Sequence, residues 1–292
     1  MNRYSIDDLS TITGLNKILI RTWENRYSFV KPHRTSTNIR YYDDKMIVKA
    51  LRYSLLVDAG FKISALTKLP AEQIDNLIND ALKNNNQTNK HSLYISQILE
   101  SSILYNQLLF HNTYEKCVKD IGIIACYQHV LLAALNRIGI LWLNDKISAT
   151  EEHFLSELIK TKLYKEIEKI GFKKLPKENW LLFLPKNELH DIGILFAYLT
   201  LKMNGHNVVY LGQNLPHSLL LSLKDNKIDN ILFSIVSNTS KLDLIEITNF
   251  LETHFSESKL HTIINKNLLT EERFQKLPTI SSIDEFINLI TK

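Results

Sequence analysis

Apolar positions near the N-terminus recur at helical spacing in short stretches separated by turn residues. The stretch Y-S-I-D-D-L predicts a helix that begins after Ser5. A serine N-cap accepts a backbone N–H, and Asp7 and Asp8 suit the positive end of the helix dipole. T-I-T-G then ends this helix, and L-N-K-I-L-I-R-T-W-E-N-R-Y predicts a second one. Two short helices joined by a glycine-containing turn are typical of a helix-turn-helix.

The polar segment that follows predicts a β-wing. It leads out at Pro32 and returns as a short strand at residues 39–42. Asn38 is expected at its tip, because asparagine tolerates a positive φ better than other residues with a side chain. Two more helices, separated at Gly60, complete an N-terminal domain that we place at residues 1–75.

The second helix is expected to divide its residues between core and DNA. Ile18, Leu19 and Trp23 are predicted to pack inward. The polar face then suits the major groove, and arginines on the wing would face phosphates. The candidate DNA-contacting residues are Asn16, Lys17, Arg21, Thr22, Arg34, Arg40 and Tyr41.

The rest of the chain predicts two further folds. Residues 82–92 are polar and low in complexity, which indicates a flexible linker. Residues 93–172 carry apolar positions at helical spacing and predict a bundle of about four helices. Residues 178–292 alternate apolar runs of strand length with helices, which predicts a doubly wound parallel sheet. The strands and helices expected there are 180–185, 207–212, 230–236 and 259–265, with a short fifth strand near 279–282, and helices at 191–204, 216–225, 240–255, 270–276 and 282–290.

The fold class is therefore multi-domain, α plus α/β. A winged helix-turn-helix, a four-helix bundle and a flavodoxin-like or Rossmann-like sheet follow one another. Any ligand site in the sheet domain is expected at the carboxyl ends of the strands.

The N-terminal domain differs from the rest of the chain in net charge. Residues 1–70 hold 12 Lys and Arg against 6 Asp and Glu, whereas the remainder holds 23 against 25. A basic module joined to a near-neutral one favours DNA as a partner. No signal or membrane-spanning run is visible, so a cytoplasmic protein is expected. Cys117 and Cys126 lie in an apolar helical stretch and are predicted to be buried free thiols.

The stretch N-E-L-H-D-I-G, residues 187–193, follows the first predicted strand of the sheet. Neutral imidazole is a common metal ligand, and a carboxylate on its other nitrogen fixes the tautomer. Glu188 or Asp191 could play that part for His190. Gly193 would let a bulky ligand approach the backbone.

Residues 3–69 resemble the MerR family of transcription regulators. The resemblance lies in I-R-T-W-E, in R-T-S-T-N-I-R-Y-Y and in L-R-Y-S-L-L-V-D-A-G-F-K-I-S-A-L. It implies a dimer that binds a palindromic operator.

The spacing E-x-H-x-x-G resembles the cobalamin-binding signature of methionine-synthase-type domains, as does G-H-N-V-V-Y-L-G-Q-N-L-P at 205–216. That resemblance implies that His190 is the lower axial ligand of cobalt and that Ser234 lies in the pocket for the nucleotide tail. The pattern W-x9-E-H, from Trp142 to Glu152 and His153, resembles the light-responsive CarH and LitR group. It implies adenosylcobalamin as cofactor: Trp142 would cover the corrin, Glu152 would bind the ribose, and His153 would reach cobalt after photolysis.

One position departs from the cobalamin pattern. Where that family has a glycine pair after the fourth strand, this chain has Ile264 and Asn265, whose side chains are expected to narrow the tail pocket. The first hypothesis is a light-sensing repressor of carotenoid or photoprotective genes, acting as a dimer or tetramer. The alternative is a regulator of the same architecture that binds no cobalamin. A corrinoid methyl carrier is a remote third, since no catalytic motif is visible and enzymatic activity is not expected.

Overall fold

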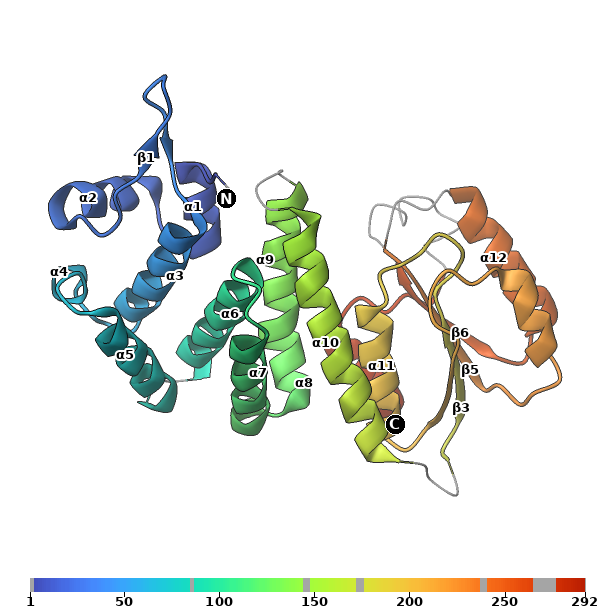
Figure 1. The fold of residues 1–292 in the computed structure, drawn as a ribbon. Helices are drawn as coiled ribbons and strands as arrows, with labels where there is room; N and C mark the ends of the chain where they lie inside the picture. Colours follow the sequence, from blue (N-terminus) through green and yellow to red (C-terminus); the bar gives the residue numbers. More distant parts are fainter. Residues whose placement is uncertain are drawn as a thin grey trace. The chain divides into compact units, whose positions relative to one another are not determined.

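The computed structural model describes residues 3–84, 87–143, 148–171, 176–236, 241–264 and 277–291 (Figure 1). The chain divides into two compact units, which we call the helical unit (Met1–Leu158) and the sheet unit (Ile159–Lys292). The elements of the helical unit are α1 (Ile6–Thr13), α2 (Lys17–Tyr27), β1 (His33–Arg34), β2 (Arg40–Tyr41), α3 (Asp44–Asp58), α4 (Ile63–Leu66), α5 (Ala71–Asn84), α6 (Gln87–Ile103), α7 (Gln107–Ile121), α8 (Ile123–Cys126), η1 (Tyr127–Leu131), α9 (Leu132–Leu143) and the start of α10 (Ala149–Ile170).

The N-terminal elements confirm the winged helix-turn-helix. Ser5 caps α1 in a reciprocal capping box with Asp8, and Gly14 ends that helix with φ of 74°. The wing is an antiparallel pair in which His33 lies opposite Tyr41 and Arg34 opposite Arg40. Asn38 has φ of 65°, as predicted for the wing tip.

The predicted linker is the first correction. Helix α5 continues to Asn84 and α6 begins at Gln87, so most of residues 82–92 are helical. Helix α6 packs against α3, α7 and α9. Adding residues to an existing helix costs far less than starting one, so a packed helix extends into a polar neighbouring sequence.

The bundle consists of α6, α7, a continuous rod formed by α8, η1 and α9, and α10. The segment η1 is a π-helix inside that rod. The four helices that the periodicity predicted are thus confirmed. Cys117 and Cys126 are buried free thiols, also as predicted. The hydrogen bond from Cys117, together with burial, raises the pKa of the Cys126 thiol, so this sulfur stays protonated in the core.

The sheet unit holds a parallel sheet in the order β4-β3-β5-β6. Its elements are β3 (Asn179–Phe183), α11 (Ile192–Met203), β4 (Asn207–Tyr210), η2 (His217–Leu223), β5 (Asn230–Ile235), α12 (Lys241–His254), β6 (Lys259–Ile264) and α13 (Ile283–Thr291). Alternate residues of β3 pack on opposite faces, so that Phe183 meets the core beneath α12 and Leu182 meets the core beneath α11 and α13. The doubly wound prediction is confirmed.

Two details of the sheet unit differ from the prediction, and a third falls outside the described residues. The helix predicted at 216–225 is a 3-10 helix over His217–Leu223. The expected fifth strand is reduced to a single parallel bridge between Thr262 and Thr279. The helix expected at 270–276 falls outside the described residues. Across the described ranges, no helix is long and apolar enough to cross a membrane.

A buried histidine of the sheet unit has a lowered pKa. His261 stacks on Trp180 with ring centroids 5.1 Å apart, and its Nε2 lies 3.1 Å from the amide oxygen of Asn230. Burial lowers the pKa of His261 below its usual 6.5, and the charge of Lys259 lowers it further.

We expect the sheet unit to lose stability as pH falls below 6.5. The unfolded chain then binds a proton that the folded unit takes up only at lower pH, which favours unfolding. Above 6.5 both states are neutral, and the penalty vanishes. Hydrogen exchange of the β3 and β5 amides at pH 5.5 and 7.5 measures the effect. His261→Gln should remove that pH dependence, whereas His254→Gln, a change at an exposed histidine, should keep it. An unchanged pH dependence in His261→Gln would contradict the assignment.

Candidate functional site

The second helix of the helix-turn-helix, α2, begins at Lys17, two residues after Leu15, where the sequence pattern predicted its start. Asn16 is its N-cap, and its side chain accepts the N–H of Ile18 at 2.8 Å. Lys17 Nζ lies 2.5 Å from Asp7 Oδ1, and the hydroxyl of Thr22 donates to the carbonyl of Ile18. Asn16, Lys17 and Thr22 are thus engaged within the helix-turn-helix. Arg21 is exposed on this helix.

The inward face of α2 is a second correction. Ile18 is 72% exposed and Leu19 is 38% exposed, so neither packs into the core as expected. Ile20, Trp23 and Glu24 are the buried residues. They follow the i, i+3, i+4 spacing of one helix face, which is the face that meets the rest of the domain.

The wing candidates are held by neighbours. Arg34 Nη1 donates to the carbonyl and the side-chain oxygen of Asn38, which braces the wing tip. Arg40 Nε is buried and lies 3.6 Å from the carboxylate of Glu24, whose side chain is also buried. Tyr42 donates its hydroxyl to that same carboxylate. Arg40 therefore balances the buried charge of Glu24. The sequence predicted only that it would face DNA phosphates.

Tyr41 is the last of the candidate DNA-contacting residues and lies on the wing. Its ring packs against His33 with centroids 5.2 Å apart, and the guanidinium of Arg3 lies 5.0 Å from its centroid. Arg3 is a neighbour of the candidate DNA-contacting surface that the sequence did not single out.

In the sheet unit, His190 is held by Glu188. The Nδ1 of His190 lies 2.7 Å from Glu188 Oε1, and because a carboxylate only accepts, the ring donates this hydrogen bond. The same oxygen accepts the backbone N–H groups of Leu189 and His190. The His190 side chain remains 65% exposed. With Nδ1 committed, Nε2 is the nitrogen through which the ring would coordinate a metal.

The second oxygen of Glu188 ties this loop to the next strand. Oε2 accepts the N–H of Val236 at 2.8 Å, directly after β5, while Glu188 itself follows β3. In the order β4-β3-β5-β6, the strand after β3 is added on one side of it and the later strands are added on the other side, so the switch point lies between β3 and β5. Ligands of open α/β sheets bind at the carboxyl ends of the strands at this switch point. Glu188 is fully buried, and its carboxylate joins the loop after β3 to the residue after β5.

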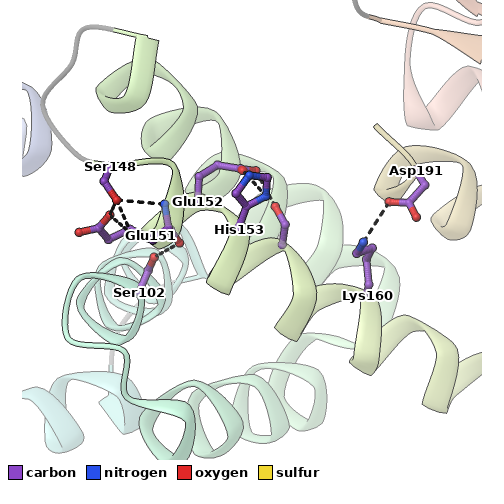
Figure 2. A network of polar contacts seen from close by, with 9 residues as sticks. Ser102, Ser148, Glu151, Glu152, His153, Lys160 and Asp191 are labelled. Atoms are coloured by element: carbon purple, nitrogen blue, oxygen red, sulfur yellow. Dashed lines mark hydrogen bonds and ion pairs between the residues drawn. The ribbon is translucent and has the colours of Figure 1, made fainter. Parts of the chain in front are cut away.

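Asp191 is paired with a lysine. Its carboxylate lies 3.7 Å from Nζ of Lys160 on α10, and Figure 2 shows the two side chains directed toward each other. Both groups belong to the sheet unit and are mostly buried. Of the two carboxylates that the sequence offered, the structure therefore assigns Glu188 to His190. Lys160 could not be singled out beforehand, because nothing in its own helix marks it.

The remaining positions of the sheet site differ in what they permit. A Cβ at Gly193 would meet no atom of the described residues within 4 Å, so these residues leave open space beside the first turn of α11. Ser234 is buried in β5, and its hydroxyl makes no hydrogen bond to the described residues. Ile264 is buried in the core beneath α12. Asn265 lies outside the described residues.

The bundle candidates lie near two helix ends. Trp142 is exposed close to the end of α9. In the first turns of α10, Glu152 accepts the hydroxyl of Ser156 at 2.6 Å, and His153 Nδ1 lies 3.5 Å from the other oxygen of Glu152. His153 is solvent-exposed. Trp142 is therefore not part of the bundle core.

The start of α10 is fixed independently of these side chains. The Ser148 hydroxyl accepts the N–H of Thr150 and donates to the carboxylate of Glu151. Ser102 donates its hydroxyl to the Glu151 carbonyl from α6 (Figure 2). These bonds set the positions from which Glu152 and His153 project.

Among the described residues, no group of three or more His, Cys, Asp and Glu side chains could hold a metal ion. A protein-built metal centre therefore has no support in those parts of the chain. A metal held in a macrocycle needs only one or two protein ligands, and His190 can supply one of them.

The fold and these sites define a class of protein. Residues 4–73 match the model of MerR HTH family regulatory proteins, and residues 63–165 match that of a B12 binding domain. The chain is a transcriptional regulator that joins a MerR-type helix-turn-helix to a B12-binding domain.

Particular relatives make the class more specific. The chain is homologous to the HTH-type transcriptional repressor CarH of Myxococcus xanthus, with 24% identity over 216 residues that cover 73% of this chain and 72% of CarH. The repressor CarA of the same organism is 23% identical over 225 residues, covering 74% of this chain and 70% of CarA. A monomethylamine corrinoid protein of Methanosarcina barkeri has a similar fold, with a TM-score of 0.51 and 16% identity over 68% of this chain and 97% of that protein.

Proposed function

We propose that this regulator is a repressor that senses light through adenosylcobalamin and controls photoprotective genes such as those for carotenoids. The observation that carries the proposal is the contact between Glu188 and His190 at the switch point of the sheet. A buried carboxylate that presents an exposed imidazole is the arrangement by which proteins orient a metal-ligating histidine. The homology to CarH and CarA supports repression.

In this proposal, residues of both units take part in binding the cofactor. When bound, adenosylcobalamin supplies a cobalt–carbon bond that light breaks. His190, oriented by Glu188, would hold cobalt, and the open space at Gly193 would leave room for the corrin. Ser234 contacts the nucleotide tail. Trp142 would cover the adenosyl group, Glu152 would bind its ribose, and the exposed His153 would be available to bind cobalt after photolysis.

Operator binding follows from the basic N-terminal domain. A dimer, or a tetramer of two dimers, presents several such domains to one operator, and linked binding raises avidity by about 10² to 10⁴. The assembled conformation would be the one that binds the cofactor more tightly, and loss of the adenosyl group on illumination would then release DNA. In this proposal the chain regulates transcription and catalyses no reaction.

A second candidate is a regulator that works without cobalamin. It is favoured by Ile264, whose buried side chain occupies protein core at the position expected for a tail-pocket glycine. In this case the helical bundle and the sheet unit serve oligomerisation or bind another partner.

A comparison of dark and illuminated samples tests the first proposal. The full chain is incubated with adenosylcobalamin in the dark, and its particle size and operator affinity are measured by small-angle scattering and gel shift before and after illumination. We expect illumination to reduce the particle size and to weaken operator binding by about 10² or more. His153→Ala should assemble in the dark but should fail to form the bis-histidine absorption spectrum after illumination.

The apo protein, illuminated in the same way, is the control and should show no change. An unchanged size together with an unchanged operator affinity in the loaded sample would exclude the light switch. Absence of any bound corrin would favour the second candidate.

A further inference from the structure

The side chain of Ile18 is an exposed apolar group on the predicted recognition helix. It is 72% exposed, more than any other large apolar residue of the described DNA-binding elements. Single exposed apolar side chains are common on protein surfaces and often mean nothing. The position of Ile18 and its immediate neighbours distinguish it from such cases.

Ile18 is the second residue of α2, and the N-terminal residues of a recognition helix are those that contact base edges in the major groove. Its backbone is already engaged: Asn16 accepts its N–H, and its carbonyl accepts the hydroxyl of Thr22. At this position the helix therefore offers a contacting surface only an aliphatic side chain.

The charges around Ile18 direct this face toward DNA. Arg21 is exposed on the same helix face at i+3, and Lys17, which precedes Ile18, is paired with Asp7. Lysine and arginine draw a surface to phosphates without distinguishing bases. An aliphatic group between them can add only an apolar contact.

We propose that Ile18 contacts the C5 methyl group of a thymine in the major groove and so reads one position of each operator half-site. Thymine is the one DNA base that presents a methyl group on its major-groove edge, so it is the natural partner of an aliphatic side chain. The proposal rests on DNA binding by the helix-turn-helix and adds a base preference to it.

The test begins with selection of the preferred sequence from a pool of random DNA duplexes by the full-length wild-type chain. Each thymine of the selected duplex is then replaced, one at a time, by deoxyuridine, which lacks only the methyl group. Wild type should lose about four-fold in affinity at one thymine, the usual effect of burying one methyl group. Ile18→Ala should bind more weakly but should show nearly equal affinity for thymine and uracil at that position.

Two further variants separate this contact from general effects. Arg21→Ala should weaken binding to both duplexes and should keep the four-fold ratio. Leu108→Ala, which changes a leucine on α7 that is 69% exposed, should leave affinity and ratio unchanged. The inference is overturned if wild type tolerates uracil at every thymine, or if Ile18→Ala keeps the wild-type ratio. If no sequence is enriched at all, sequence-specific DNA binding fails, and the inference fails with it.

Discussion

Replacing His190 by alanine is expected to abolish stable capture of cobalamin. The imidazole is the proposed protein ligand of cobalt, and loss of even the groups that orient such a ligand typically lowers metal affinity by about 10- to 100-fold. Gel filtration of full-length protein after incubation with adenosylcobalamin in the dark, with absorbance read in line, measures how much corrin elutes with the chain. His254→Ala, at an exposed histidine of the same unit, should retain the wild-type amount.

Glu188 allows a finer version of this experiment. Its two oxygens accept hydrogen bonds from His190 Nδ1 and from three backbone N–H groups, those of Leu189, His190 and Val236. Glu188→Ala would leave those groups unpaired and should destabilise the sheet unit as well as weaken cobalamin binding. His190→Ala should weaken binding with little loss of stability, because its side chain is mostly exposed.

Wild-type protein that elutes without corrin would overturn the expectation for His190. Replacing Ile264 and Asn265 by glycine then tests whether side chains in the tail pocket are the cause. Recovery of corrin binding would identify the pocket as blocked. Continued failure would leave the cobalamin-independent regulator as the better account.

Replacing Arg52 by alanine is expected to destabilise the helical unit by about 3 kcal/mol. Arg52 on α3 donates two hydrogen bonds to Glu100 on α6, at 3.0 and 2.6 Å, and its Nη1 lies 3.0 Å from Asp75 on α5. Glu100 is buried, and removing one partner of a buried ion pair strands the other charge, which typically costs about 3 to 5 kcal/mol. The lower end applies because Arg52 is 29% exposed.

Urea unfolding of the full chain measures this loss. Arg26→Ala, at an exposed arginine of α2, is the matched control and should stay within about 0.5 kcal/mol of wild type. The double variant Arg52→Met with Glu100→Leu should recover most of the stability, since an apolar pair avoids the stranded charge. A loss below about 0.5 kcal/mol in Arg52→Ala would show that Glu100 finds another partner.

The structure also shows which predictions depended on local chemistry alone. The cap at Ser5, the left-handed end of α1 at Gly14 and the wing tip at Asn38 were predictable because each is decided within a few residues. The same holds for the alternation of strands and helices in the sheet unit, which the length and spacing of apolar runs indicate.

The sequence by itself thus determined the order of the folds, the chemistry around His190 and the basic character of the N-terminal domain. Tertiary structure alone decided which side of α2 faces the core, so that Ile18 is exposed and Glu24 is buried against Arg40. It also decided that Glu188, and not Asp191, holds His190, because the competing partner Lys160 comes from another helix. Periodicity along a chain gives the spacing of a helix face but not its direction, and direction depends on residues that are distant in the sequence.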